Sequence, residues 1–123
     1  RKENMSDSDL RERTKQFALR VMRLADALPN STKGRAIGQQ IIRSATSVAA
    51  NYRAACRGRS KAEFLAKLGV CLEEADETLF WLELISDGEI LRTELVQPLL
   101  NEANQLTAIL VASINTTKRR QQA

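Results

Sequence analysis

The sequence contains no histidine, and several other residue types are scarce. Without histidine the chain cannot build a Ser-His-Asp or Cys-His nucleophile arrangement, and it lacks the imidazole ligands of the usual zinc and haem sites. Aromatic residues make up only 4% of the 123 residues, and five glycines and two prolines are few for a turn-rich all-β protein. These absences point away from an ordinary enzyme, and we expect no catalytic residue and no cofactor.

Long hydrophobic runs are absent as well. No apolar segment approaches the roughly 18 residues that a membrane span needs. Residues 1–10 have no apolar stretch of the kind found in secretory signals. Two cysteines in a chain without an export signal favour a reducing, cytoplasmic location and no membrane partner. Whether residues 1–4, which precede Met5, are native to the protein is left open.

The hydrophobic residues that are present recur with the helical period of 3.6 residues. This period and the flanking capping residues predict helices at about 8–28, 33–57, 61–86 and 93–117. Asp7 or Ser8 is expected to cap the first helix, and Ser60 with Glu63 forms a predicted capping box at the third. Short links between long helices favour antiparallel neighbours. We therefore predict an all-α, up-down-up-down four-helix bundle, with residues 1–123 forming a single domain.

Each predicted helix has one apolar stripe that is expected to face the core. On the fourth helix the stripe contains Leu95, Leu99, Ala103, Leu106, Leu110 and Ile114. Cys56 and Cys71 also lie on such stripes. If the second and third helices are antiparallel, these cysteines are offset by about 12 Å along the helix axis, which predicts buried thiols rather than a disulfide.

Charge is sorted along the chain, although the net charge is only +4. Residues 27–62 contain seven basic and no acidic side chains, whereas residues 63–102 contain ten acidic and two basic ones. The arginines of the second helix fall within an arc of about 80°, clear of the apolar face. Because arginine binds phosphate through two nitrogen atoms, this stripe favours contact with the backbone of RNA or DNA. The candidate contact residues are Arg35, Arg43, Arg53, Arg57, Arg59 and Lys61.

A solvated face whose arginines pair with acidic side chains of a neighbouring helix is the alternative interpretation. Aromatic residues do not alternate with these arginines, so stacking on single-stranded bases has little support. Nucleic-acid contacts would therefore be made mostly to the backbone, with weak reading of sequence.

The third helix carries a second apolar strip beside its main stripe. Val70, Trp81 and Leu84 fall on the side that carries Glu74 and Glu77. Because an exposed tryptophan rimmed by charge is typical of an interface, we predict that these five residues contact another copy of the chain. An acidic face and an arginine face on one chain could dock head to tail and close a ring. A wide core face that absorbs the three apolar residues is the alternative.

Four acidic residues gather within residues 73–77. A carboxylate site for Mg²⁺ or Ca²⁺ would need acids that converge from another helix. The second helix has none, and the fourth has only Glu94 and Glu102. We therefore expect no metal site.

The central part of the chain resembles a known family. The motifs that carry the resemblance are Ile42 to Ala55 around Asn51, Arg59 to Phe64, Glu73 to Glu77, and Trp81 to Glu83. Together they are similar to the bacterial four helix bundle protein family, also called the 23S ribosomal RNA intervening-sequence proteins, over residues 14 to 115. Many members have Asn-Ile-Ala-Glu-Gly where this chain has Asn51-Tyr52-Arg53-Ala54-Ala55, so the chain looks like an arginine-rich subgroup.

The resemblance implies an antiparallel four-helix protomer that assembles into a ring-shaped homopentamer and has no catalytic activity. A related protein, the accessory protein of diversity-generating retroelements, has this fold and a basic surface that binds nucleic acid and reverse transcriptase. Most family members have no established function. Two hypotheses follow for this chain. It is either an oligomer whose arginines contact RNA or DNA, or an oligomeric scaffold or protein–protein adaptor whose arginines pair with acids of the neighbouring protomer.

Overall fold

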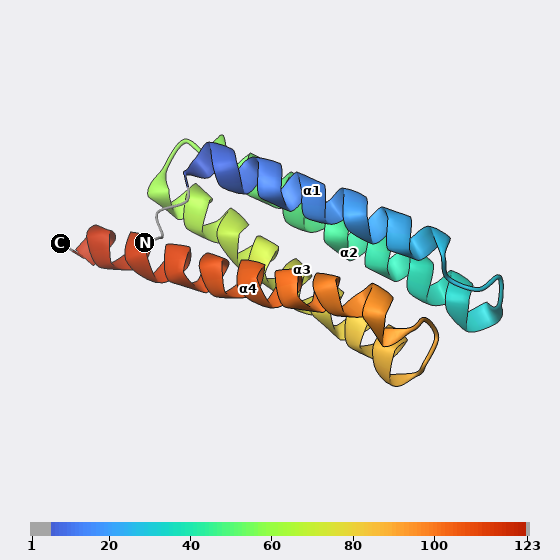
Figure 1. Ribbon diagram of the computed structural model, residues 1–123. Coiled ribbons are helices and arrows are strands. Elements are labelled where there is room, and N and C mark those ends of the chain that lie inside the picture. The colour runs from blue at the N-terminus through green and yellow to red at the C-terminus, as the bar shows by residue number, and fades with distance from the viewer. Residues whose placement is uncertain (1–5, 123) are drawn as a thin grey trace.

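The computed structural model describes residues 6–122, and within this range the chain forms four α-helices and no strand. They are α1 (Asp7–Asp26), α2 (Thr32–Cys56), α3 (Lys61–Asp87) and α4 (Thr93–Gln122). Each helix runs back along the one before it (Figure 1), and the prediction of an all-α four-helix bundle is confirmed. Residues 1–4, whose origin the sequence leaves open, lie outside the described range.

Serine side chains cap the first three helices. The caps are Ser6, Ser31 and Ser60. Each side-chain oxygen accepts a hydrogen bond from the backbone N–H three residues later, which satisfies a donor that helix geometry leaves free. The expectation that Asp7 or Ser8 caps α1 is wrong, because Asp9 forms a reciprocal capping box with Ser6.

The turn before α3 follows the predicted pattern only in part. Ser60 caps the helix by accepting the N–H of Glu63 at 3.1 Å. The Glu63 carboxylate, however, accepts the backbone N–H of Arg59 at 3.0 Å, one residue before the cap. The capping box predicted for Ser60 and Glu63 is therefore only half formed. The Glu63 side chain bonds to the backbone of Arg59 in the turn and not to the backbone of Ser60.

Two other connections depend on backbone geometry. In the α1–α2 connection, Gly34 packs so closely that a Cβ atom there would lie 2.0 Å from the carbonyl oxygen of Pro29. In the α3–α4 connection, the residue with left-handed backbone is Glu89, with φ of 53°, and not the preceding Gly88. Glycine is therefore required at position 34 for reasons of space.

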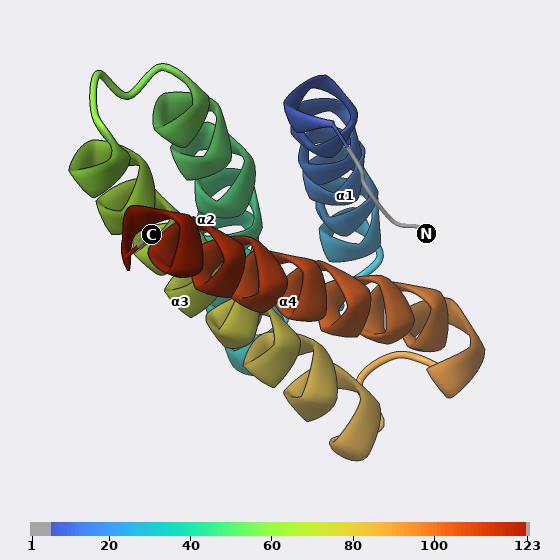
Figure 2. The same ribbon diagram turned by 90° about the vertical axis from the view of Figure 1, so that its left-hand side faces the viewer.

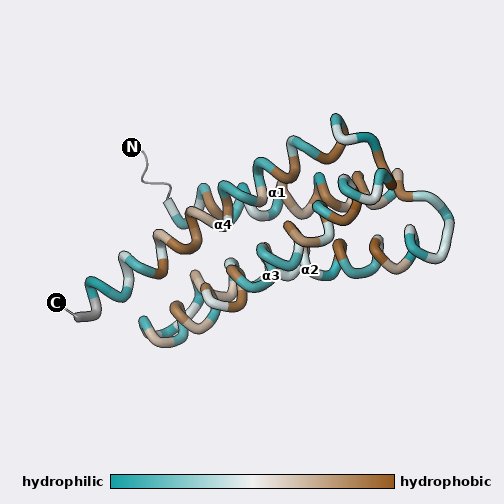
Figure 3. Tube along the Cα trace, turned by 90° about the horizontal axis from the view of Figure 1, so that it is seen from below, coloured by the Kyte–Doolittle hydropathy of each residue, from teal (hydrophilic) through white to brown (hydrophobic). Residues whose placement is uncertain are grey.

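The core runs the length of the bundle, and apolar and polar positions alternate along every helix (Figure 3). The fully buried large side chains include Phe17, Val21, Ile41, Val48, Tyr52, Leu68, Leu82, Ile85, Leu106 and Leu110. The apolar stripe predicted for the fourth helix is wrong at Leu95, which is 48% exposed, whereas Val96 is completely buried. Both positions are compatible with the helical spacing to Leu99, and the packing of α4 on α3 selects Val96.

The bundle is packed unevenly. α2 packs closely on α3, and α3 on α4, whereas α1 and α4 make the fewest contacts of any adjacent pair. In Figure 2 the first turns of α1 lie apart from the last turns of α4 at the end of the bundle that faces the viewer. The ends of α2 and α4 and the starts of α1 and α3 lie together at one end of the molecule (Figures 1 and 2).

Candidate nucleic-acid and oligomer interfaces

All six predicted nucleic-acid contact residues are exposed. Arg35, Arg43 and Arg53 lie on α2, Arg57 follows its last residue, and the remaining two are Arg59 in the turn and Lys61 at the start of α3. We call these six residues the basic stripe. They differ in whether their charge is paired with an acidic side chain of the same protein.

Arg43 forms ion pairs with two acidic residues of α3. Its Nη1 donates to both carboxylate oxygens of Glu74, at 3.2 and 3.3 Å, and its Nη2 donates to Glu77. The hydrogen bond to Glu77 raises the pKa of Arg43, and the same bond lowers the pKa of Glu77. At this position the structure therefore shows the alternative left open by the sequence, an arginine paired with the acids of a neighbouring helix.

Trp81 continues this polar chain. Its indole Nε1 donates to Glu77 at 3.1 Å, while the ring packs half-buried against the core. Of the five predicted oligomer contacts, Glu74 and Glu77 are thus engaged by Arg43 within the protomer. Val70 and Trp81 are half-buried, and Leu84 is 39% exposed.

Phe80 is the residue that the sequence reasoning missed on this face. Its side chain is 50% exposed, more than any other large hydrophobic side chain in the described chain. Its ring meets Trp81 edge to face at a centroid distance of 5.1 Å. Phe80 and Leu84 are four residues apart, so they lie on the same face of α3. That i, i+4 spacing, away from the main apolar stripe, is the signal that could have revealed it.

On the other flank of α2, Arg53 and Arg57 line a groove shared with α1. The groove is lined by Ser8, Asp9, Arg11, Glu12, Lys15, Ala49, Ala50, Arg53 and Arg57. Within residues 6–122 neither Arg53 nor Arg57 forms an ion pair. The sequence reasoning missed Arg11 and Lys15, because it followed the basic stripe along one helix and could not see which residues of α1 face it.

Further basic residues lie at the same end of the bundle. Lys118, Arg119 and Arg120 are exposed near the end of α4. Figure 2 looks onto this end, where the α2–α3 turn and the last turns of α4 both face the viewer. Basic residues of the α2–α3 turn and of the last turns of α4 are therefore gathered at one end of the bundle.

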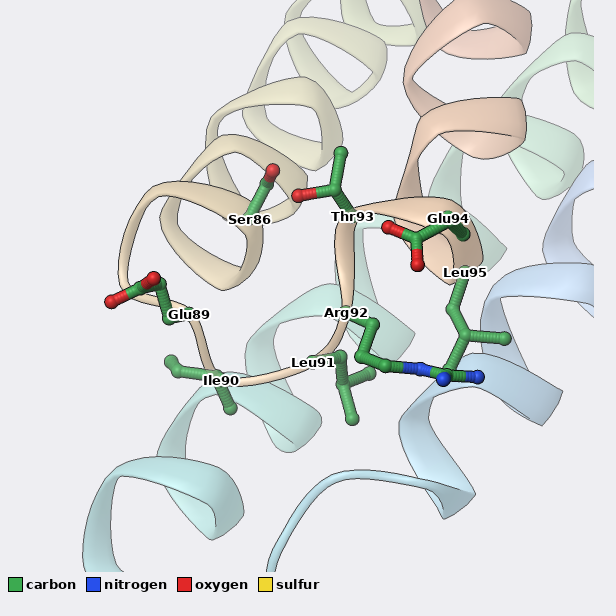
Figure 4. A pocket seen from close by; sticks show the side chains of 8 residues that line it. All are labelled: Ser86, Glu89, Ile90, Leu91, Arg92, Thr93, Glu94 and Leu95. Carbon is green, nitrogen blue, oxygen red and sulfur yellow. The ribbon is translucent and has the colours of Figure 1, made fainter.

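The opposite end of the bundle has a second depression, at the α3–α4 connection. It is lined by Ser86 and by residues 89–95. Figure 4 shows Glu89 and Arg92 on opposite sides of the connecting segment, with no convergence of their charged groups. The residues that line this depression therefore do not form a candidate catalytic or binding site.

The acidic and thiol side chains form no metal centre in the part of the chain that the structure describes. Cys71 is fully buried as a free thiol, and burial raises its pKa to about 12. Cys56 is also a free thiol, but it is half-buried rather than buried as expected; burial raises its pKa as well. Among the described residues, no helix combines the length and the apolarity that crossing a membrane requires.

Asn51, at the centre of the recognised motif, bonds within its own helix. Its side-chain amide donates to the backbone oxygen and to the hydroxyl of Ser47, both at 2.9 Å. The residue is half-buried and makes no hydrogen bond to another helix among residues 6–122. Its role here is therefore local to α2.

Comparison with known proteins gives two findings. The model of the family described as 23S rRNA-intervening sequence protein matches residues 6–112. Among solved structures, the chain is similar to the 1.70 Å crystal structure of a protein with unknown function from the S23 ribosomal protein family of Bacteroides thetaiotaomicron VPI-5482. The two are 35% identical with a TM-score of 0.79, and the match covers 85% of this chain and 96% of the other. No curated protein matches the chain.

Proposed function

The chain belongs to the 23S rRNA-intervening sequence protein family, and on this basis we propose that it is a non-enzymatic, oligomeric protein that binds the backbone of nucleic acids. The observation that carries the proposal is the state of Arg53, Arg57 and Arg59. All three are exposed, and none forms an ion pair within residues 6–122. Exposed arginines without an acidic partner are suited to bind phosphate, which they contact through two nitrogen atoms.

Structured RNA is the first ligand to test, because the family name refers to an intervening sequence of ribosomal RNA. Affinity for a folded RNA would be measured by fluorescence anisotropy at about 50 and 200 mM salt. Backbone binding releases counterions, so affinity should fall steeply between the two conditions. Negligible affinity at the lower salt, or affinity that does not change with salt, would remove the proposal.

The proposal also assigns a homo-oligomer, for which a pentameric ring is the expected state. Support comes from α3, where Phe80 and Leu84 expose apolar surface and where Glu73, on the same helix, is also exposed. Light scattering at micromolar concentration tests this assembly, and a monomer would contradict it. Replacing Phe80 and Leu84 together by serine should dissociate the oligomer. The equally exposed Leu95, replaced by serine, is the control.

An oligomeric scaffold or protein–protein adaptor is the second candidate function. The pairing of Arg43 with Glu74 and Glu77 favours it, because it removes part of the basic stripe from contact with any ligand. In this case Arg53, Arg57 and Arg59 would pair with acids of the neighbouring protomer. Glu74 and Glu77 already have a partner, so the exposed Glu73, Asp76 and Glu83 of α3 would supply those acids. An oligomer that forms normally but binds no RNA at low salt would support the adaptor.

A further inference from the structure

The groove between α1 and α2 has cations on both of its walls. Arg11 and Lys15 line it from α1, and Arg53 and Arg57 line it from the end of α2. In each pair the two residues are four apart, which separates them by about 6 Å along the helix axis. Each wall therefore offers two positive charges in line with the groove.

None of the four cations that line the groove forms an ion pair with another of residues 6–122. The groove also contains two acids, so its lining carries four positive and two negative charges, and the hydrogen-bond partners of both acids are uncharged. Asp9 accepts the N–H of Ser6 in the α1 capping box, and Glu12 accepts the side-chain amide of Gln16 at 2.8 Å.

The two alanines give the groove its shape. Ala49 and Ala50 line it from α2, and their small side chains leave a space of about 610 Å³ between the two charged walls. No aromatic side chain lines this space. Stacking of unpaired bases, which binders of single strands use, has no platform here. A duplex keeps its bases stacked inside and presents its phosphates outward, so it suits a charged groove without aromatic residues.

We infer that this groove seats one phosphodiester strand of a duplex nucleic acid, gripped between Arg11 and Lys15 on one wall and Arg53 and Arg57 on the other. The inference rests on the proposed function and deepens it, because it names the form of nucleic acid and adds two residues of α1 to the contact. Recognition is then independent of sequence, since phosphates alone are contacted.

The test uses the α1 wall, which the proposed function does not need. The double substitution Arg11→Gln and Lys15→Gln is compared with Arg20→Gln and Arg23→Gln. The control removes two exposed cations from the same helix but outside the groove. Glutamine is a good helix former, and circular dichroism verifies that both variants remain folded. The ligands are an RNA duplex, a DNA duplex and a single strand of equal length.

We expect the groove variant to lose roughly tenfold in duplex affinity at about 100 mM salt, and its log–log salt slope to shrink by about 2. The control should stay within about twofold of the parent protein. Ala50→Glu, which places a negative charge among the four cations, should also weaken duplex binding by at least tenfold. Ala50 is exposed, so the larger side chain fits without disturbing the core.

Three results would count against the inference. Equal losses in the groove variant and the control would overturn the groove while leaving the proposed function intact. Tighter binding of the single strand than of the duplex would overturn the choice of a duplex. Failure of the parent protein to bind any of the three ligands at low salt would overturn the proposed function, and the groove with it.

Discussion

Arg13 on α1 binds Glu102 on α4 through two nitrogen atoms. Nε donates to Oε2 at 2.7 Å and Nη2 donates to Oε1 at 2.8 Å, while Nη2 also donates to Gln105 at 2.7 Å. Both charged side chains are largely covered, with 24% and 16% of their surfaces exposed. Among residues 6–122 no other ion pair joins these two helices. It bridges the seam where the bundle is packed least tightly.

Glu102→Gln should therefore destabilise the protein by about 1 to 2 kcal/mol, because Arg13 is left partly buried without a charged partner. Urea unfolding measures the loss. Hydrogen exchange should show faster opening in α1 than in α2 and α3, which retain their own contacts. Arg20→Gln, at an exposed position of α1, serves as the control. A Glu102→Gln variant as stable as the control would contradict this role for the pair.

Gly34 and Gly69 should respond in opposite directions to alanine. A Cβ at position 34 would lie 2.0 Å from a backbone oxygen, and the backbone cannot move as a flexible side chain can. Gly34→Ala should thus cost about 2 kcal/mol. A Cβ at position 69 meets nothing within 4 Å, and alanine favours a helix interior, so Gly69→Ala should gain about 0.5 to 1 kcal/mol. Thermal unfolding of both variants checks the signs, and a stabilised Gly34→Ala would refute the close contact.

A buried pair of hydroxyl groups joins α2 and α3. Thr78 Oγ1 lies 2.8 Å from Ser44 Oγ, and both residues are fully buried. Ser44→Ala and Thr78→Val should each cost about 1 kcal/mol, since each leaves the other hydroxyl with one bond fewer. The double variant should cost less than the two losses added together. Denaturant titration of all four proteins measures this coupling, and strict additivity would show that the hydroxyl groups do not interact.

Acidification should act locally on Glu77 and Trp81. The hydrogen bond from Arg43 holds the pKa of Glu77 below its ordinary value of 4.5. A lowered pKa means that the carboxylate's stabilising contribution is complete above the unfolded-state pKa and is lost as pH falls through the folded-state pKa. The protein has a single tryptophan, so its emission reports the bond between its indole and Glu77.

We expect the tryptophan emission to change with a midpoint below pH 4.5, and Glu77→Gln should abolish the transition. Far-ultraviolet circular dichroism recorded in parallel separates this local step from global acid unfolding. A midpoint at or above the ordinary glutamate value would contradict the lowered pKa.

The sequence predicts which segments are helical better than it predicts where the helices end or which of their residues are buried. The apolar period is strong over four long segments, and the observed helices start within one residue of the predicted boundaries. Their ends are less accurate, and α4 runs five residues beyond the prediction. Burial is a further detail that the sequence leaves undecided, since either Leu95 or Val96 continues the apolar stripe of α4 and only packing against the neighbouring helix decides which is buried.

The candidate interfaces show the same division more clearly. The sequence places Arg43 and Arg53 on one polar face of α2, and both are exposed. It does not show that Arg43 leans toward the acids of α3 while Arg53 lines a groove with α1. Phe80 was missed because its exposure depends on how α3 is turned against its neighbours.

The sequence by itself determined the all-α class, the four helices and the sorting of charge between them. These properties depend on residue spacing and composition along the chain, so they can be inferred without knowing how the helices pack. Only the tertiary structure decided which charges meet, because a salt bridge or a groove needs side chains from two helices at a particular rotation and height. The ion pairs of Arg43 with the acids of α3, the ion pair of Arg13 with Glu102 and the cationic groove all belong to this second kind.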